Sequence, residues 1–296
     1  MTSLTRRSFL ALSAMLPSAM LAQTKTAKPA QKNAPAPKDP KKTIPIGLEM
    51  YSVREELKRD PQATVRAVTQ MGYTGVEFYG PYYDWTHDQA KDMRKLLDEL
   101  GIRCFSTHNG YEVMQPGSKL EHARDLNLIL GSSYIVQASA PKIDKLDGWN
   151  AVAENLNTVA AQLEPSGLKV GYHNHEPEFT ITDGQRPIEL LAEKTKPTVM
   201  LQLDVGTCLA CGSDPAEWIR LNPGRIKSLH LKDWSPDPDK GYKVLFGEGA
   251  GEWVDIFAAA ESVGGVEYYL MEQEGSRFPE LDTAKRCLDS YRTLRG

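Results

Sequence analysis

The sequence predicts an α/β protein, a single (β/α)8 barrel of the TIM type. Short apolar segments alternate with helical segments from residue 46 onward, which is typical of parallel βαβ units. Eight such units in about 250 residues match the usual size of this barrel. No glycine-rich nucleotide loop follows the first apolar segment, so the competing fold, an open doubly wound sheet, lacks its usual signature.

The expected strands are short runs of apolar residues, each bounded by turn or helix signals. In chain order they cover residues 46–51, 75–79, 103–107, 134–137, 168–173, 199–204, 226–231 and 268–272. Asp60 and Pro61, and again Asp214 and Pro215, have the pattern of an N-cap followed by proline in the first helical turn. Gly101 is placed to end a helix. The expected helices include 61–71, 88–100, 149–163, 254–263 and 278–294.

The first 43 residues are expected to precede the barrel. Arg6 and Arg7 stand before a short apolar stretch that ends near Ala22, which resembles a twin-arginine signal peptide. Residues 1–22 are therefore predicted to be a cleavable signal, and the protein to be periplasmic or secreted. Residues 23–43, rich in Lys, Pro and Ala, are predicted to be a flexible linker, and residues 44–296 the barrel. We expect no stable membrane anchor, because no later stretch is long and apolar enough.

Charge and cysteine content exclude two classes of protein. The 296-residue chain has a net charge of −4. Residues 1–43 carry a surplus of seven positive charges, which leaves −11 on residues 44–296. Such an acidic body repels phosphate backbones, so we expect no nucleic-acid partner. Four cysteines are too few for a disulfide scaffold; Cys208 and Cys211 are expected to be small, half-buried residues, with a local disulfide as the alternative.

Titratable and aromatic residues gather where the predicted strands end. They are Glu49 and Tyr51, Glu77 and Tyr79, His108, then His173, His175 and Glu178, then Asp204, then His230, Lys232 and Trp234, and finally Glu272. In a (β/α)8 barrel these ends meet at one mouth, where the chemistry takes place. Each residue alone is explained by a hydrogen bond or a turn. Together, buried carboxylates and imidazoles need a positive partner, and a divalent metal ion suits this donor set.

Four motifs on the later strands resemble those of the xylose isomerase-like barrels of the sugar phosphate isomerase/epimerase family. They are LDVG at 203–206, SLHLKD at 228–233, FGEG at 246–249 and LME at 270–272. The resemblance covers about residues 44–295. It implies one divalent ion (Mn, Co, Zn or Mg) held by a Glu, an Asp, a His and a Glu. Asp204, His230 and Glu272 match, and His173 stands in place of the first glutamate, with His175 and Glu178 as alternative strand-five ligands.

The resemblance implies a metal-dependent sugar isomerase, epimerase, lyase or hydratase that works through an enediolate. A histidine as the strand-five ligand resembles the branches that dehydrate, hydrate or eliminate. His175 or Glu178 would remove a proton beside a carbonyl, and His108 or Lys232 would deliver a second proton or orient hydroxyls. Glu49, Tyr51, Glu77, Tyr79 and Trp234 would bind the sugar, with Tyr82 and Trp85 as further wall candidates. Export favours a non-phosphorylated keto-sugar or 3-keto-glycoside as the substrate.

Two other functions compete with this interpretation. The first is a non-catalytic, exported sugar-binding barrel that keeps the pocket without the metal. The second is the endonuclease-IV-like DNA-repair branch of the same superfamily, which carries a histidine where this chain has Thr207 and which the acidic body disfavours. Bound metal separates the enzyme from the binding protein. The sequence is compatible with a monomer or a homodimer.

Overall fold

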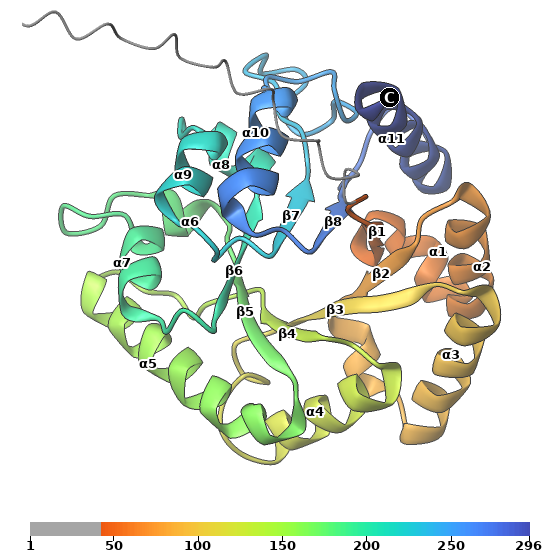
Figure 1. Ribbon diagram of the computed structural model, residues 1–296, viewed down its shortest axis with the longest axis horizontal. Coiled ribbons are helices and arrows are strands. Elements are labelled where there is room, and N and C mark those ends of the chain that lie inside the picture. Colours follow the sequence, from red (N-terminus) through yellow and green to blue (C-terminus); the bar gives the residue numbers. More distant parts are fainter. Residues whose placement is uncertain (1–42) are drawn as a thin grey trace, which may run out of the picture. The chain divides into compact units, whose positions relative to one another are not determined.

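Eight parallel strands form a closed barrel in the computed structural model, which describes residues 43–296 (Figure 1). They are β1 (Ile46–Glu49), β2 (Gly75–Phe78), β3 (Arg103–Asn109), β4 (Tyr134–Gln137), β5 (Lys169–His173), β6 (Met200–Asp204), β7 (Ser228–Leu231) and β8 (Tyr268–Met271). The predicted fold is confirmed, and no strand boundary differs from its expected position by more than two residues. The predicted signal peptide, 1–22, and nearly all of the predicted linker, 23–43, lie outside the described residues.

Helices surround the barrel. They are α1 (Arg54–Arg59), α2 (Pro61–Met71), α3 (His87–Leu100), α4 (Ser118–Leu130), α5 (Leu146–Leu163), α6 (Glu176–Phe179), α7 (Pro187–Lys194), α8 (Val205–Ala210), α9 (Pro215–Leu221), α10 (Trp253–Ala259) and α11 (Glu280–Arg295), with η1 (Met50–Val53), η2 (Gly80–Asp84), η3 (Glu164–Ser166) and η4 (Ala260–Gly264). The expected caps are present: Asp60 accepts the Ala63 N–H and Asp214 that of Ala216. The sequence prediction missed α4 and α7, whose N-cap residues, Gly117 and Arg186, make no side-chain cap.

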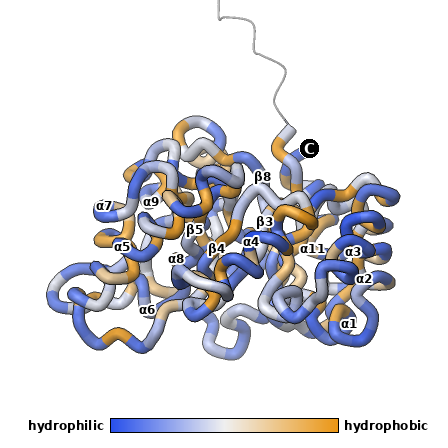
Figure 2. Tube along the Cα trace, turned by 90° about the horizontal axis from the view of Figure 1, so that it is seen from below, coloured by the Kyte–Doolittle hydropathy of each residue, from blue (hydrophilic) through white to orange (hydrophobic). Residues whose placement is uncertain are grey.

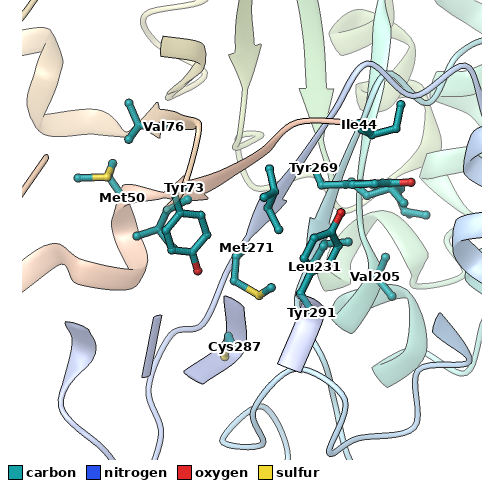
Figure 3. Packing of buried hydrophobic residues seen from close by; sticks show 14 of the residues in the cluster. Ile44, Met50, Tyr73, Val76, Val205, Leu231, Tyr269, Met271, Cys287 and Tyr291 are labelled. Carbon is teal, nitrogen blue, oxygen red and sulfur yellow. The ribbon is translucent and has the colours of Figure 1, made fainter. Parts of the chain in front are cut away.

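The outer face of the strands packs against these helices. Leu231 of β7 and Tyr269 and Met271 of β8 point toward Tyr291 and Cys287 of α11 (Figure 3). Hydrophilic and hydrophobic residues alternate along the helices (Figure 2), as expected for helices with one buried face. Within residues 43–296, no helix has both the length and the apolarity needed to cross a membrane.

Aromatic residues fill the amino-terminal end of the barrel interior. Phe105, Tyr134, Val136, Met200, Tyr268 and Leu270 form one buried cluster there, which we call the floor. Gly75 leaves room for the Phe105 ring, because a Cβ on Gly75 would lie 2.2 Å from it. The inward-facing residues nearer the carboxyl ends of the strands are polar, so the functional groups lie at the opposite end, which we call the mouth.

The strand register sets neighbouring mouth residues at similar heights. Glu49 of β1 pairs with Glu77 of β2, His173 of β5 with Gln202 of β6, and Asp204 of β6 with His230 of β7. Side chains on one face of a strand recur every second residue. Gln202 and Asp204 therefore both point into the barrel, one above the other.

Candidate active site

A cavity of about 360 Å³ opens at the mouth. Its lining includes Glu49, Tyr51, Tyr79, His108, His173, His175, Glu272 and Glu274, from the ends of β1, β2, β3, β5 and β8. Tyr51 and Tyr79 meet edge to face, with ring centroids 5.1 Å apart. The structure thus brings seven of the thirteen residues expected at the site onto one cavity wall, with Asp204, His230, Lys232 and Glu77 buried beside it.

Three expected metal ligands form one donor group. His173, Asp204 and Glu272 each offer a donor atom, and these atoms lie within 4.8 Å of one another. All three side chains are buried. His173 Nε2 lies 3.9 Å from Asp204 Oδ2. Two carboxylates and an imidazole are a donor set that Mn, Co and Zn accept.

Gln202 determines which nitrogen of His173 faces Asp204. Its Nε2 donates to Glu77 Oε2 at 2.9 Å, which leaves Gln202 Oε1 as the acceptor 3.1 Å from His173 Nδ1. The hydrogen of His173 is therefore on Nδ1, and the Nε2 lone pair faces the Asp204 carboxylate. Burial, followed by the nearby His230 and His108, lowers the pKa of His173 well below its usual value. A neutral imidazole that faces a carboxylate without a hydrogen between them fits a cation site.

Lys232 lies on the other side of the same carboxylates. Its Nζ is 3.4 Å from Asp204 Oδ2 and 3.7 Å from Glu272 Oε1, and it also pairs with Glu274. Burial alone would lower the pKa of Lys232, but these carboxylates hold it well above its usual value. Lys232 is not among the residues that line the cavity. It is a fixed cation that holds two of the expected metal ligands in place.

His230 is held between two carboxylates. Its Nδ1 lies 2.6 Å from Glu272 Oε2, and its Nε2 lies 2.7 Å from Glu77 Oε1. Burial by itself lowers the pKa of His230, but Glu272 and Glu77 together raise it to about 10. In this structure the ring therefore carries a proton on each nitrogen. The Nδ1 proton stands between His230 and Glu272, where the resemblance to the sugar isomerases places a metal ion.

Two further histidines flank His173. Its ring centroid is 4.6 Å from that of His108 and 5.0 Å from that of His175. His108 Nε2 faces two acceptor oxygens, Gln202 Oε1 at 2.7 Å and Glu77 Oε1 at 3.0 Å. It must therefore carry a hydrogen, which leaves Nδ1 as the atom that can exchange a proton. His175 is exposed at the rim of the cavity.

Glu178 and Trp234 are not where the sequence analysis expected them. After β5 the chain turns directly into α6, and Glu178 caps that turn: it accepts the His175 N–H at 2.9 Å and pairs with the Tyr172 hydroxyl. Tyr172 precedes His173 and so points out of the barrel. Glu178 is buried there and does not line the cavity. Trp234 also lies off the cavity, because the chain turns at Asp233, which accepts the Trp234 N–H.

Two other expectations also change, and one alternative is excluded. Glu77, expected to bind substrate, is fully buried below the cavity. Tyr82 is buried, and its hydroxyl donates to Asn109 Oδ1 at 2.6 Å, while Trp85 packs edge to face against Phe78. These two aromatic rings therefore stabilise the barrel wall. Cys208 and Cys211 are both free, so the local disulfide is absent from this part of the described chain.

Sequence reasoning missed Gln202, Tyr242 and the role of Asp233. Gln202 could have been found, because it stands two residues before Asp204 on the inward face of β6. Tyr242 covers the Lys232 ammonium, 5.0 Å from its ring centroid, and comes from a loop without a sequence signal. Asp233 is no surface ion-pair residue: it accepts backbone N–H groups from Gly247, Gly249 and Gly251 at 2.9–3.2 Å and so fixes the loop over the mouth.

The fold and the mouth define a (β/α)8 barrel with a histidine- and carboxylate-rich centre at the carboxyl ends of its strands. The model of the family described as "Xylose isomerase-like TIM barrel" matches residues 65–294. This match covers most of the chain, which therefore belongs to that family.

Named relatives point in the same direction. An inosose dehydratase from Clostridium botulinum (strain Alaska E43 / Type E3) is 30% identical over 195 residues, which cover 58% of this chain and 64% of the relative. The chain thus matches less than two thirds of that relative's length. A solved sugar phosphate isomerase/epimerase from Parabacteroides distasonis ATCC 8503 has 27% identity and a TM-score of 0.72, covering 83% of this chain and 92% of that chain. These names support the expectation of a sugar-modifying enzyme.

A third likeness concerns the fold. The crystal structure of the IolI protein with a bound zinc atom superimposes with a TM-score of 0.66. Its identity is 16%, and the likeness covers 85% of this chain and 99% of that protein.

Proposed function

We propose that the protein is a metal-dependent enzyme that removes a proton beside the carbonyl of a non-phosphorylated keto-sugar and eliminates water from the neighbouring carbons. The observation that carries this proposal is the meeting of two sets of groups in one cavity. His173 and Glu272 of the donor group line it, and so do His108 and His175, two imidazoles that can act as general acid and base. The inosose dehydratase relative supports elimination over simple epimerisation.

His173, Asp204 and Glu272 would hold the metal ion, with His230 Nδ1 beside them. The lone pair of His173 that faces Asp204 supports this assignment, and so does the zinc atom of the IolI protein. When bound, Mn, Co, Zn or Mg would act as a Lewis acid that polarises the substrate carbonyl. Lys232 keeps the Asp204 and Glu272 carboxylates in position.

The proton steps fall to the two imidazoles at the cavity wall. His175, exposed at the rim, would accept the proton from the carbon next to the carbonyl. As that C–H bond breaks, a C=C bond forms and the C–O bond of the next carbon breaks. His108 would deliver a proton through Nδ1 to the departing hydroxyl, which leaves as water. Glu77 Oε1, 3.0 Å from His108 Nε2, holds this ring in place.

The charged side chains of the cavity wall favour an uncharged substrate. None of the described residues that line it is Lys or Arg, whereas Glu49, Glu272 and Glu274 are present. A wall with carboxyl groups and with no basic side chain among its described residues disfavours a sugar phosphate. Tyr51 and Tyr79 offer apolar surface to a sugar ring. Keto-sugars, cyclic keto-polyols and 3-keto-glycosides fit these features.

The test is turnover of such compounds in deuterated water, followed by NMR. The metal-loaded protein should exchange the proton beside the carbonyl and release water from an inosose, a keto-hexose or a 3-keto-glucoside. His175→Ala should lose both, and the surface variant His87→Ala should keep them. Binding of these sugars without exchange or elimination, in protein that takes up no metal, would instead support the sugar-binding barrel.

We further propose export through the twin-arginine route. The support is the Arg6-Arg7 pair and the apolar stretch after it. Fractionation of cells should find the mature protein outside the cytoplasm, and an Arg6→Lys/Arg7→Lys variant should stay inside. Equal distribution of the two proteins would remove this part of the proposal.

A further inference from the structure

Glu77 binds four other side chains, although it does not line the cavity. Its Oε1 lies 2.7 Å from His230 Nε2 and 3.0 Å from His108 Nε2. Its Oε2 accepts from Gln202 Nε2 at 2.9 Å and from the Ser106 hydroxyl. Through Gln202, the same carboxylate also reaches His173. One buried carboxylate thus touches two mouth histidines and controls a third.

We propose that Glu77 is the positioning residue of the mouth: it fixes which nitrogen of each of the three histidines faces the reaction. This inference rests on the proposed function for the reaction it serves. The orientation it describes follows from the hydrogen bonds and can be measured without any substrate.

The argument is clearest at His230. Both of its nitrogens lie near carboxylates, and Glu77 accepts the Nε2 hydrogen. Nδ1, beside Glu272, is then the only ring atom left for a cation. A carboxylate that holds the second nitrogen of a ligand histidine fixes the ring and makes it a better ligand. Ser106 and Gln202 hold the other oxygen of Glu77, so that the carboxylate itself does not turn.

The same carboxylate sets the other two rings. At His108 it accepts the Nε2 hydrogen together with Gln202 Oε1, so that Nδ1 is left to exchange a proton. At His173 it acts through Gln202: because Gln202 Nε2 donates to Glu77 Oε2, Gln202 Oε1 is turned toward His173 Nδ1. His173 Nε2 then faces Asp204. The network thus fixes one nitrogen of each ring, and it leaves Nδ1 of His108 free, Nε2 of His173 facing Asp204 and Nδ1 of His230 facing Glu272.

The test compares wild type with Glu77→Gln, which keeps the shape but places an N–H₂ group opposite N–H donors. Two readouts are needed: Mn²⁺ affinity by calorimetry, and solvent exchange of the imidazole N–H protons in metal-free, ¹⁵N-histidine-labelled protein. We expect Mn²⁺ affinity about 10 to 100 times weaker. We also expect the Nε2–H protons of His230 and His108, protected in wild type, to exchange rapidly in the variant.

Tyr82→Phe is the matched control, because it removes a buried hydroxyl beside β3 without touching a histidine. It should lower the melting temperature and leave both readouts unchanged. Wild-type Mn²⁺ affinity and protected N–H protons in Glu77→Gln would overturn the inference. Failure of every keto-sugar to react would count against the proposed function alone, since neither readout uses a substrate.

Discussion

The two ends of the barrel interior are built from the same strands but differ in chemistry. β3 contributes Phe105 to the floor and His108 to the mouth, and β8 contributes Tyr268 to the floor and leads into Glu272 at the mouth. The amino-terminal end also has a hollow, of about 560 Å³, but its charges come from lysines, glutamates and Arg225, and none of the described residues that line it is a histidine.

This difference separates stability from function along each strand. Apolar burial at the floor stabilises the fold by about 25 cal/mol per Å². The mouth costs stability, because it keeps the carboxyl groups of Glu49, Glu77, Asp204 and Glu272 out of water. One oxygen of Glu49 is buried without a hydrogen-bond partner among residues 43–296. Burial and the neighbouring Glu77 raise the pKa of Glu49 well above its usual value. A buried carboxyl group with a shifted pKa is typical of functional sites.

The largest expected effect is a loss of metal binding and turnover at the mouth, with the floor left intact. Asp204→Asn keeps the side-chain shape and the oxygen that accepts the Thr207 N–H, but it removes a charged metal ligand. Turnover should fall by more than about a thousandfold, because metal binding supplies several kcal/mol of transition-state stabilisation. Elemental analysis should find the metal lost, while the thermal unfolding curve shifts little. An active, metal-loaded variant would contradict the assignment.

The converse change is made at the floor and lowers the stability of the fold without affecting metal binding. Phe105→Ala removes a buried ring from the cluster and should lower the free energy of unfolding by about 3 kcal/mol. Metal content per folded chain should stay that of wild type, because no mouth residue touches Phe105 in that cluster. Denaturant titration and elemental analysis check the two halves of this prediction. Metal loss in the folded variant would show that the ends are coupled.

A pH series sharpens the comparison. In metal-free protein His230 has a pKa of about 10, against about 6.5 in the unfolded chain. Its contribution to stability is therefore complete below pH 6.5 and is lost as the pH rises toward 10. The free energy of unfolding should fall across that window in wild type and less steeply in His230→Asn. Equal slopes in the two proteins would argue against a charged His230.

The smallest expected effect concerns Gln202. Gln202→Leu removes the oxygen that holds His173 and His108, but it leaves every expected ligand in place. Mn²⁺ affinity should weaken about tenfold, as for other residues that orient metal ligands. Calorimetry measures it, and the floor variant Phe105→Ala serves as the control with wild-type affinity. Unchanged affinity in Gln202→Leu would remove Gln202 from the site.

The fold was predictable because strands and helices repeat with clear ends. Asp60 and Asp214 begin helices as their N-cap pattern predicts, whereas α4 and α7 begin without a capping side chain and were missed. Much of the mouth was also predictable. In a (β/α)8 barrel the carboxyl ends of all strands meet at one end, so the polar residues there lie close together.

The rest of the site depends on contacts between residues far apart in sequence. Glu77 and His230 meet across 153 positions, and no local pattern shows that Glu77 lies below the cavity and not on its wall. Glu178 was misplaced because the turn into α6 reverses its direction directly after β5. Trp234 was misplaced for a similar reason, since Asp233 turns the chain by binding distant backbone N–H groups.

The central claim is that the mouth, and not the floor, holds a divalent metal ion. Anomalous diffraction at the manganese edge, from crystals grown with Mn²⁺, tests it most directly. The account predicts a peak within coordination distance of His173, Asp204 and Glu272, and none at the amino-terminal end. A mouth without a peak, in crystals of protein that turns over a keto-sugar, would contradict the account.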